Sequence, residues 1–423
     1  MARLLYSTLF YAFLPLILVR LLFRATSTRA YARRWSERFG FVPHRKAGKN
    51  YIWLHAASVG ETLAAVPLVK ALQAKYPDYR LMVTCMTPTG SERIKAAFGD
   101  SAAHCYAPYD TPDALMRFLN RIKPKILIIM ETELWPNTIA ACHKRNIPVV
   151  LANARLSQKS ALGYSRVKSL VKPMLESMTA VVAQHHDDGA RFVDLGLPAS
   201  GLSISGNIKF DLTLDAPLKQ YAKQLGGQWR GVDDRLICLA ASTHRGEDEI
   251  ILQAMSQIKA STEHPPLLVL VPRHPERFDQ VAELCTSAGF TLARHSKADA
   301  TDGADILLGD TMGELMAFYG ACDIAFVGGS LVPTGGHNMI EPAAWGVPIL
   351  TGPHLFNFAE ASRLLLEADA MQVCDNADTL ALHCIELLNN QQQRQTMGDA
   401  GRNVAEDNRG AVDRLLAVIA NSL

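Results

Sequence analysis

The sequence predicts two α/β domains in tandem, each a parallel sheet covered by helices on both faces, with an apolar segment before them. From residue 51 on, short and nearly continuous apolar runs alternate with helix-like segments, which is typical of strands buried on both faces of a sheet. The alternation stops over 207–234 and then restarts. The 423 residues, 48% hydrophobic and 20% charged, suffice for about two or three domains and exclude disordered, collagen-like and small disulfide-rich proteins.

The first predicted domain covers 51–210 and holds six candidate strands. These short apolar runs are 51–56, 81–86, 125–130, 149–152, 179–183 and 202–205. Helix-like segments lie between them at 61–75, 111–122, 163–177 and 187–195. Strands that alternate with helices predict parallel pairing through crossover helices, so this domain is predicted to be doubly wound.

The second predicted domain covers 211–390 and begins with a connection and a polar helix. Its candidate strands are 236–241, 267–271, 306–308, 324–327 and 348–350, and its helix-like segments are 247–260, 276–288, 312–321, 357–368 and 378–389. A polar, Gln-rich helical tail follows over 391–423. Because open sheets of this kind bind ligands at the carboxyl ends of their strands, we expect a site in a cleft between the two domains. An intact Gly-x-Gly-x-x-Gly or Walker sequence is missing, which disfavours dinucleotide and P-loop sites.

Residues 1–50 are predicted to hold a retained membrane anchor, either spanning or interfacial. The run 4–19 is uncharged but shorter than the roughly 20 residues that cross a bilayer. Extending it to Phe23 includes Arg20, which sits near one end and can reach the headgroups, while Pro15 would kink the helix. A cleaved signal peptide is the alternative. It is disfavoured because the basic residues follow the apolar run and no small-x-small cleavage site precedes them.

The formal net charge of +2 averages two unlike parts of the chain. Residues 1–50 hold ten basic side chains and one acid, Glu37, which makes this segment +9 and the remainder −7. The arginines at 24–38 are expected on the cytoplasmic side, held by anionic lipid. A nucleic-acid-binding arm is the alternative, but the adjacent apolar run favours lipid and no nucleic-acid partner is expected. The ten residues are Arg3, Arg20, Arg24, Arg29, Arg33, Arg34, Arg38, Arg45, Lys46 and Lys49.

The eight cysteines are scattered and form no C-x-x-C pair. Several lie inside apolar runs, as Cys238 does within 236–239. This distribution predicts buried free thiols in a reducing compartment rather than disulfides.

The first candidate strand runs into Ser58, Gly60 and Glu61 at the start of a helix, and two interpretations compete. Ser58 and Glu61 have the spacing of a capping box, in which both side chains bind free N–H groups of the first turn. Alternatively, Glu61 is a general base in the cleft, with Gly60 leaving room for a substrate. Spacing alone favours the cap. Because a helix N-terminus favours a carboxylate, we expect the pKa of Glu61 to be low and the side chain to be ionised at pH 7.

Acidic and basic residues follow two further strands of the first domain. Glu131 and Glu133 come directly after 125–130, where cleft residues collect. Pro136 marks the start of a helix, and acidic residues are common there. At least one of these two acids could therefore have this structural role instead of a role in the cleft. Arg155 follows 149–152 and is positioned to bind a phosphate or carboxylate of a substrate.

The second domain has its strongest signal where three strands end. Glycines that open a helix expose backbone N–H groups, which favour an anion. Arg273 would neutralise a phosphate, and Glu341, one turn into a helix, would accept ribose hydroxyls. Taken singly, a pair of glycines could be an ordinary tight turn, and Glu341 could simply interact with the helix dipole from the first turn. The convergence of the segments on one edge of the sheet nevertheless predicts a nucleotide pocket. The segments are 272–275, 309–314, 328–330 and 334–342.

Two histidine-containing segments have further interpretations. The sequence His185-His186-Asp187-Asp188 has metal-ligand types, but it also looks like a strand end followed by a helix cap, and the chain lacks an Asp-x-Asp triplet beside it. The cap is favoured. His244, directly after 236–241, is expected to line the cleft.

Taken together, these motifs resemble those of the 3-deoxy-D-manno-octulosonic acid (Kdo) transferases of lipopolysaccharide biosynthesis, which use CMP-Kdo and a lipid A precursor. The resemblance extends over essentially the whole chain, including the N-terminal segment. Each motif alone is weak, and their combination is specific. The motifs are Ala57-Ser58-Val59-Gly60-Glu61, Glu131-Thr132-Glu133-Leu134-Trp135-Pro136, Pro272-Arg273-His274, Met312-Gly313-Glu314 and Asn338-Met339-Ile340-Glu341-Pro342.

The resemblance implies a GT-B glycosyltransferase on the cytoplasmic face of the inner membrane, with two Rossmann-like domains. The acceptor would bind the first domain and CMP the second, and Glu61 would be the general base. A metal ion or cofactor is not expected. The resemblance carries CMP binding to Pro272, Arg273, Met312, Gly313, Glu314, Asn338, Met339, Ile340 and Glu341. The further substrate-cleft candidates are Ser58, Gly60, Glu131, Arg155 and His244.

The implied reaction is a single displacement that inverts the anomeric carbon. A glucosamine hydroxyl of the lipid A precursor (lipid IVA) would lose its proton to Glu61 and attack Kdo, and CMP would leave against helix N-termini and Arg273. Another nucleotide-sugar transferase or an epimerase of the same fold would leave the anchor unexplained. A lipid- or nucleotide-binding membrane protein without activity would share both anchor and pocket, and a transfer assay separates it from an enzyme.

Overall fold

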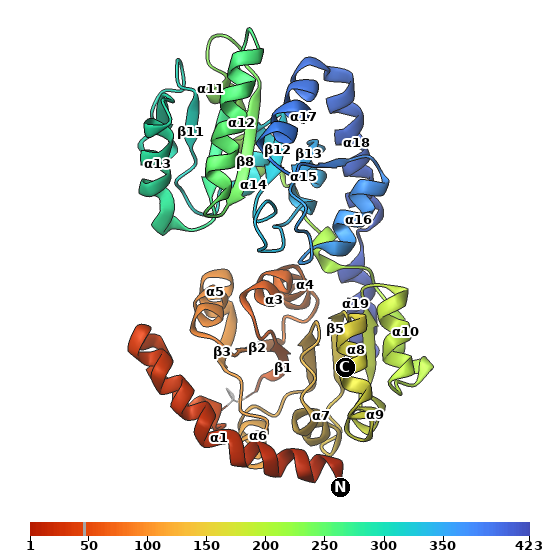
Figure 1. The fold of residues 1–423 in the computed structure, drawn as a ribbon. Helices are drawn as coiled ribbons and strands as arrows, with labels where there is room; N and C mark the ends of the chain where they lie inside the picture. Colours follow the sequence, from red (N-terminus) through yellow and green to blue (C-terminus); the bar gives the residue numbers. More distant parts are fainter. Residues whose placement is uncertain (45–47) are drawn as a thin grey trace. The chain divides into compact units, whose positions relative to one another are not determined.

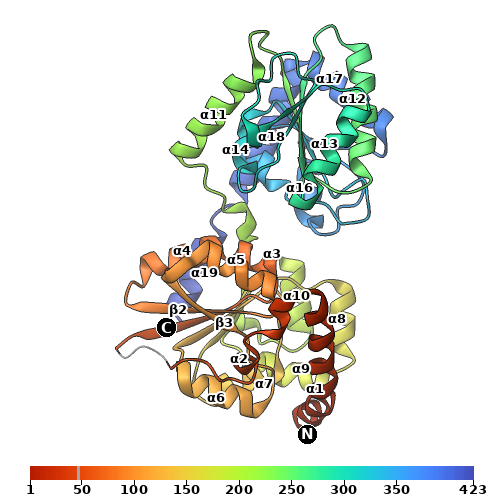
Figure 2. The same ribbon diagram turned by 90° about the vertical axis from the view of Figure 1, so that its left-hand side faces the viewer.

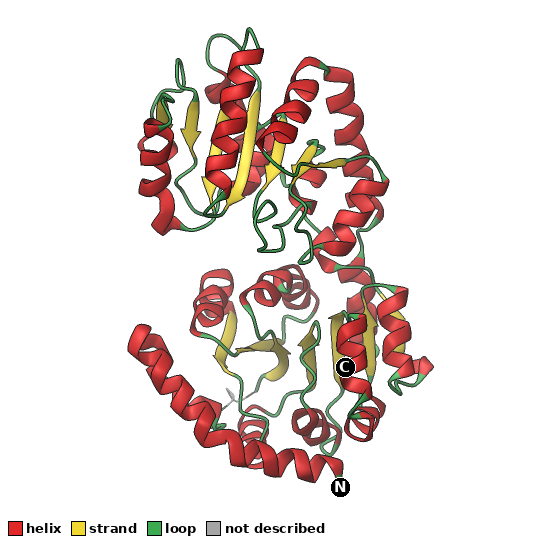
Figure 3. Ribbon diagram, viewed as in Figure 1, coloured by secondary structure: helices red, strands yellow, loops and turns green. Residues whose placement is uncertain are grey.

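The computed structural model describes residues 1–44 and 48–423 and divides into two compact units (Figure 1). Unit 1 comprises Met1–Asp211 and Arg409–Leu423, and unit 2 comprises Leu212–Asn408. In each unit a sheet lies between layers of helices, as Figure 3 shows in yellow and red. The predicted α/β architecture with two parallel sheets is confirmed. Arg45 and Lys46 of the predicted basic segment lie outside the described residues.

Unit 1 has a seven-stranded sheet in the order β3-β2-β1-β4-β5-β6-β7, with every pair of neighbours parallel. The chain reverses its direction of winding between β1 and β4, which places a topological switch point there. Alternate residues of β1 enter opposite cores, since Leu54 packs in one cluster and Trp53 in the other. The strands are β1 (Asn50–His55), β2 (Tyr79–Cys85), β3 (Ala102–Tyr106), β4 (Ile126–Met130), β5 (Val149–Ala154), β6 (Ala180–Ala183) and β7 (Leu202–Ile204).

Helices cover both faces of this sheet. Residues of α4, α5 and α19 form one core cluster with the strands, and residues of α6, α7, α9 and α10 form the other. The helices are α1 (Ala2–Ser27), α2 (Trp35–Arg38), α3 (Val59–Ala64), α4 (Val66–Lys75), α5 (Pro88–Phe98), α6 (Pro112–Ile122), α7 (Pro136–His143), α8 (Gln158–Ser165), α9 (Lys168–Glu176), α10 (His186–Asp194) and α19 (Ala411–Ala420), with short 3-10 turns that include η1 (Arg29–Ala32) and η4 (Ile208–Phe210).

Unit 2 repeats this architecture with the strand order β10-β11-β9-β8-β12-β13-β14, again all parallel. Its strands are β8 (Ile237–Thr243), β9 (Leu267–Pro272), β10 (Leu292–Arg294), β11 (Ile306–Leu308), β12 (Ile324–Val327), β13 (Ile349–Thr351) and β14 (Met371–Val373). Its helices are α11 (Ala216–Arg230), α12 (Glu247–Ser261), α13 (Phe278–Ser287), α14 (Leu315–Ala321), α15 (Ile340–Trp345), α16 (Ala359–Glu367), α17 (Ala377–Asn389) and α18 (Gln391–Asp407).

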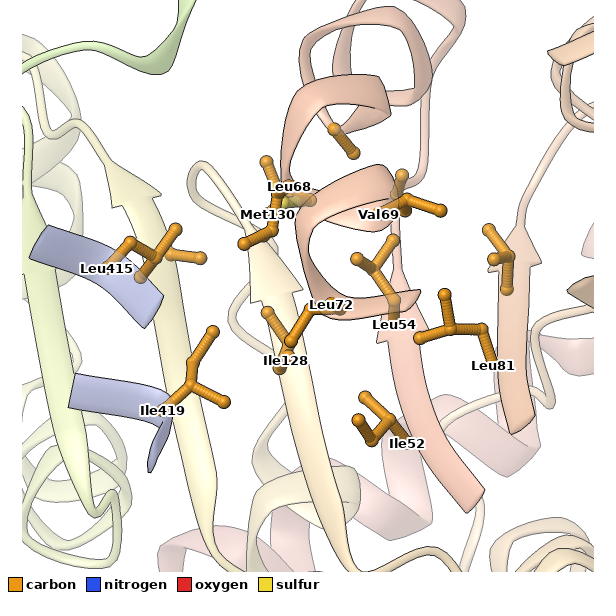
Figure 4. Packing of buried hydrophobic residues seen from close by; sticks show 14 of the residues in the cluster. Ile52, Leu54, Leu68, Val69, Leu72, Leu81, Ile128, Met130, Leu415 and Ile419 are labelled. Carbon is orange, nitrogen blue, oxygen red and sulfur yellow. The ribbon is translucent and has the colours of Figure 1, made fainter. Parts of the chain in front are cut away.

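The last helix returns to unit 1, which differs from the predicted separate tail over 391–423. Leu415 and Ile419 of α19 are fully buried and lie beside the β-sheet residue Ile128 (Figure 4). The Asp211 carboxylate accepts hydrogen bonds from the backbone N–H groups of Gly410 and Val412, at 2.6 and 2.5 Å, and so caps the start of this helix. The sequence pattern reveals an amphipathic helix but not which sheet its apolar face covers.

We expect Leu415→Ala to lower the free energy of unfolding by about 3 kcal/mol, because it leaves a cavity in the core of unit 1. Urea denaturation followed by circular dichroism measures the change. Asp413→Ala is the matched control, since Asp413 is exposed on the same helix. Equal stability of Leu415→Ala and Asp413→Ala would contradict the packing of α19 in this core.

The N-terminal segment also belongs to unit 1, where 1–50 was predicted to be a separate part. Within Ala2–Thr26 of α1, an apolar stretch with a mean hydropathy of 1.8 is long enough to cross a membrane. Two of the predicted lipid-binding arginines have other roles. Arg34 and Arg38 lie over the Tyr106 ring, at 4.8 and 4.3 Å, and Arg34 pairs with Glu37 at 2.7 Å. Charge reversal of Arg34 would therefore disturb the fold as well as any lipid contact.

All eight cysteines are buried and free, as the sequence predicts. The Sγ atoms of Cys238 and Cys384 lie 3.4 Å apart within the core of unit 2.

Candidate active site

Glu61 lies in the first turn of α3, directly beyond the carboxyl end of β1. The Ser58 hydroxyl accepts a hydrogen bond from the Glu61 backbone N–H at 3.2 Å, as expected of an N-cap. The Glu61 carboxylate accepts a hydrogen bond from the N–H of Ala57 at 2.8 Å. In a standard capping box it would accept from the N–H of the N-cap residue, Ser58, so the bond here is made one residue earlier in the chain. Only 8% of Glu61 is exposed. The structure therefore contains the cap and also buries the carboxylate at the edge of the sheet where ligands bind.

The predicted low pKa of Glu61 is wrong. The pKa of Glu61 is raised to about 7: burial is the largest cause, the hydrogen bonds from Ala57 and Ser58 oppose it, and the negative charges of Glu133 and Glu131 add to the rise. Desolvation therefore outweighs the field of a helix with six residues. A carboxyl group with this pKa can take up and release a proton near neutral pH, which suits a general base.

Glu131 and Glu133 follow β4 at the same edge of the sheet. Glu131 has a φ of 56°, an uncommon conformation for a residue with a side chain, and lies between two cations. Its Oε2 atom is 3.6 Å from Nε of Arg155, and its Oε1 atom is 3.8 Å from Nζ of Lys209. Glu133 accepts a hydrogen bond from the Trp135 indole at 2.9 Å. The structure thus brings Glu131 and Arg155 together, and strained backbone of this kind is enriched at functional sites.

Lys209, in η4, is a member of this cluster that the sequence analysis missed. Burial lowers the pKa of Lys209, and the Glu131 charge opposes that shift. Lys209 lies in the segment 207–234, which was interpreted as a connection between domains. Its position in the sequence could have indicated this, because Lys209 follows β7, the last strand of the first sheet, by a few residues and so lies near the carboxyl end of that strand.

In unit 2, buried Glu247 organises the loop after β12. The carboxylate accepts four backbone N–H groups: His244 and Gly329 donate to Oε2 at 2.8 and 2.7 Å, while Ser330 and Leu331 donate to Oε1, each at 2.9 Å. Gly329 has a φ of 69°, which favours glycine.

Three histidines gather at this edge of the unit 2 sheet. The Nε2 atoms of His244 and His337 are 2.8 Å apart, and the His274 ring centroid is 5.4 Å from that of His244. Burial lowers the pKa of both His244 and His337, the latter to about 4, and the neighbouring rings and Arg273 add to this. Both rings are therefore neutral at pH 7, and one Nε2–H donates to the other. The positive charge of Arg273 acts on His244, and the cleft role of His244 stays a prediction.

The remaining predicted CMP-binding residues fall into two groups. The first group is exposed or partly exposed and comprises Arg273, Met312, Gly313, Glu314, Asn338 and Glu341. Pro272, Met339 and Ile340 are buried, so they can contribute only backbone atoms to a ligand.

Two carboxylates of this group are already hydrogen-bonded. Glu341 accepts from the Asn338 amide at 3.0 Å, and burial raises the pKa of Glu341 to about 7. Glu314 accepts from the Tyr221 hydroxyl and lies 3.5 Å from Nε2 of His295. The Asn338 amide thus occupies one oxygen of the Glu341 carboxylate, and any ligand hydroxyl that bound this oxygen would have to share it with Asn338.

From the sequence, a metal site at 185–188 is the alternative to a helix cap. Within residues 1–44 and 48–423, the structure has no group of three or more His, Cys, Asp or Glu side chains placed to hold a metal ion. In the segment His185–Asp188, α10 begins at His186, and Asp188 accepts from the Leu156 N–H at 2.9 Å and pairs with Arg191. This segment therefore starts a helix.

Comparisons with known proteins identify the family. A model of the 3-deoxy-D-manno-octulosonic-acid transferase (kdotransferase) family matches residues 33–212. A 3-deoxy-D-manno-octulosonic acid transferase of Haemophilus influenzae is 45% identical over 423 residues, covering 99% of this chain and 98% of the relative. The chain belongs to the Kdo transferase family. A Bordetella pertussis member is 36% identical over 382 residues, covering 88% of this chain and 87% of the relative.

Solved structures of lower identity show the same fold. A glycosyltransferase from Rickettsia africae has a TM-score of 0.59 at 13% identity and covers 88% of this chain and 98% of its own. The UDP-GlcNAc 2-epimerase of Neisseria meningitidis has a TM-score of 0.58 at 13% identity and covers 87% of this chain and 100% of its own. Membership of the Kdo transferase family and these neighbours confirm a GT-B glycosyltransferase. The family model's range contains Glu61, Glu131, Arg155 and Lys209.

Proposed function

We propose that this Kdo transferase moves Kdo from CMP-Kdo to a hydroxyl of the glucosamine disaccharide of a lipid A precursor, lipid IVA, with inversion and with Glu61 as general base. The observation that carries this proposal is the buried Glu61 carboxylate, with a pKa of about 7, at the carboxyl edge of a Kdo transferase's N-terminal sheet. A sugar hydroxyl has a high pKa, so its attack on an anomeric carbon is accelerated when a base removes the proton.

The cluster around Glu61 fits a phosphorylated acceptor. Arg155 is half exposed, with 51% of its side chain accessible, and its guanidinium lies beside Glu131 rather than in a tight pair. A guanidinium held at 3.6 Å keeps donors available for a phosphate of the acceptor. Lys209 adds a second positive charge within the cluster. In this proposal Glu61 takes the proton, while Arg155 and Lys209 orient the acceptor.

The donor site in the proposal is the edge of the unit 2 sheet. Arg273 would offset the charge that develops on the CMP phosphate as the bond to Kdo breaks. The loop that Glu247 holds would keep this edge in one conformation, since the N–H groups of Gly329 and Ser330 already donate to the Glu247 carboxylate. In this proposal a resident metal ion is not required, because Arg273 supplies the positive charge.

The proposed location is the cytoplasmic face of the inner membrane, with α1 as the contact to the bilayer. Both the apolar stretch of α1 and the arginines that follow support it. A membrane-held enzyme searches for a lipid acceptor in two dimensions, which gives the anchor a catalytic purpose.

The test is transfer from CMP-Kdo to purified lipid IVA by the full-length protein in lipid vesicles. We expect CMP release together with a product whose mass increases by whole Kdo residues, and NMR of the new linkage should show the anomeric configuration opposite to that of the donor. We expect EDTA to leave the rate unchanged. CMP binding without transfer would show a binding protein instead, and strong inhibition by EDTA would contradict the metal-free mechanism.

The pH profile tests the role of Glu61 more finely. The base must be deprotonated, so we expect kcat to fall about tenfold per pH unit below roughly pH 7. Glu133→Gln removes a charge that raises the pKa of Glu61, so the acidic limb should move to lower pH. Ser58→Ala removes a hydrogen bond that lowers this pKa, so the limb should move to higher pH. The limb should persist in Glu341→Gln, because Glu341 titrates in the same range but lies in unit 2. Shifts of the same sign in Glu133→Gln and Ser58→Ala would contradict the assignment.

A further inference from the structure

Polar side chains hold the first half of α1 against unit 1. The Ser7 hydroxyl is 9% exposed and exchanges hydrogen bonds with the Asn137 side chain, whose Nδ2 donates to it at 2.9 Å. The Tyr11 hydroxyl donates to Asp113 at 2.5 Å, and the Tyr6 hydroxyl bonds the buried carboxylate of Asp110. These contacts recur over two turns of the helix and define one docked stripe.

The docked stripe also contributes apolar packing. Phe10 lies 6.4 Å from the Tyr109 ring and, with Trp53 and Ile129, lines an apolar cavity of unit 1. Both views show α1 running alongside unit 1, past α7 and α9, and bending partway along its length (Figures 1 and 2). Pro15 lies inside the helix and accounts for the bend. A bent helix can follow the surface of a globular unit over its whole length.

The other side of α1 is apolar and uncovered. Its members, here called the lipid face, are 48–62% exposed: Leu5, Leu9, Phe13, Leu16 and Val19. Five arginines with exposed side chains lie near it in sequence: Arg3, Arg20, Arg24, Arg29 and Arg33. An apolar face bordered by cations complements a bilayer with anionic headgroups.

Crossing the bilayer and docking on unit 1 exclude each other. A helix that crosses about 30 Å of hydrocarbon needs about 20 of the 26 residues of α1, so residues 8–11 would enter the hydrocarbon in every register and Ser7 would lie in it or at its boundary. Asp110, Asp113 and Asn137 cannot follow them there, because they lie at the starts of α6 and α7 in the folded unit. Asp110 itself accepts three further hydrogen bonds, from the N–H of Asn137 and from the N–H and hydroxyl of Thr138. Extraction of α1 would break contacts within a buried polar network.

We infer that α1 does not cross the membrane but lies along the surface of an anionic bilayer, docked on unit 1 through Ser7 and Tyr11, with its lipid face in the interfacial layer. This inference rests on the proposed membrane-bound acceptor and adds the topology of the anchor. The N-terminus then stays on the same side as both units. The docking residues Asp110 and Asn137 lie at the carboxyl edge of the parallel sheet, the edge that also holds Glu61. The bilayer surface is thereby brought to the edge that carries the proposed base.

Thiol labelling in sealed vesicles tests the topology. A cysteine is added before Met1 through a short Gly-Ser linker, and Glu263→Cys, on an exposed loop of unit 2, reports the catalytic side. The eight native cysteines are buried, so the unchanged chain gives the background. We expect an impermeant maleimide to label both added cysteines in inside-out vesicles and neither in right-side-out vesicles. Labelling of the N-terminal cysteine from the opposite side to Glu263→Cys would show a spanning helix and overturn the inference.

A depth measurement gives an independent answer. Leu5, Leu9 and Leu16 lie within about 40° of one another around the helix, and Leu5 and Leu16 are about 16 Å apart along it. Environment-sensitive fluorophores on Leu5→Cys, Leu9→Cys and Leu16→Cys should therefore be quenched equally by shallow spin-labelled lipids in vesicles rich in anionic lipid. A steady change in depth from Leu5 to Leu16 would contradict a surface helix.

The two proposals fail separately in these vesicles. If the N-terminal cysteine labels from the opposite side while Kdo transfer continues, the topology is wrong and the proposed function stands. If both cysteines label from one side but CMP-Kdo and lipid IVA give no product, the surface location stands and the proposed function is wrong.

Discussion

Glu61→Gln should lower kcat about 10³-fold while leaving the KM for CMP-Kdo within about twofold. A positioned general base typically contributes 10²–10⁴-fold, and the expected loss corresponds to about 4 kcal/mol of transition-state stabilisation. The donor site of the proposal lies in unit 2, so donor binding should be unaffected. Initial rates with saturating lipid IVA measure both constants. Glu61→Asp keeps a carboxylate one methylene short of its position and should retain more activity than Glu61→Gln. Activity of Glu61→Gln close to that of the unchanged enzyme would rule out Glu61 as the base.

Thermal unfolding separates lost chemistry from a lost fold. The amide that Glu61→Gln introduces is the same size as the carboxylate, and its oxygen can still accept from the Ala57 N–H. The folded pKa of Glu61, about 7, lies above the unfolded value of about 4.3, so ionisation of Glu61 costs stability as pH rises from about 4 to 7. Glu61→Gln removes that cost. We therefore expect it to melt at a higher temperature than the unchanged enzyme at pH 8 and at a similar temperature at pH 4. A variant that melts lower at pH 8 would show that its inactivity comes from damage to the fold.

The centre of each sheet could be predicted from sequence, whereas three of the four edge strands could not; the exception is β7, predicted as 202–205. The strands 306–308 and 324–327 were predicted with the bounds that the structure has, because each is an unbroken apolar run buried on both faces. The missed strands β3, β10 and β14 lie at sheet edges, and each carries a polar residue, such as His104 or Arg294. An edge strand contacts one neighbouring strand and faces solvent along its other side, so its sequence resembles that of a loop.

The candidate site shows the same limit at the level of single residues. The position of Glu61 follows from a strand that ends and a helix that begins, which is local information. Its pKa depends on burial and on Glu133, which is 72 residues away in the chain. Lys209 joins the cluster only because η4 returns to the sheet edge. The apolar face of α19 is visible in the sequence, but its partner is a sheet more than 200 residues earlier. Long-range packing therefore decides both the pKa of Glu61 and which residues lie beside it.

Glu247→Ala should be the most damaging substitution in unit 2. Each carboxylate oxygen of Glu247 accepts two backbone N–H groups, and the residue is fully buried. Removing the carboxylate leaves four donors without this acceptor, and a buried unsatisfied group costs about 1–3 kcal/mol. We therefore expect the free energy of unfolding to fall by at least about 4 kcal/mol. The loop at 328–331 should also lose its fixed conformation, and CMP affinity should fall with it.

Hydrogen exchange followed by mass spectrometry locates this effect. We expect the amides of Gly329, Ser330 and Leu331 to exchange much faster in Glu247→Ala, while peptides from the unit 1 sheet remain as protected as before. Glu247→Gln should be nearly as damaging, because its NH₂ group faces two N–H donors that it cannot accept. Glu249→Ala is the matched control: Glu249 lies in the same first turn but is exposed, so its loss should cost about 0.5 kcal/mol. Unchanged protection of these three amides in Glu247→Ala would mean that the loop is held by its own backbone bonds. The donor site would then not depend on Glu247.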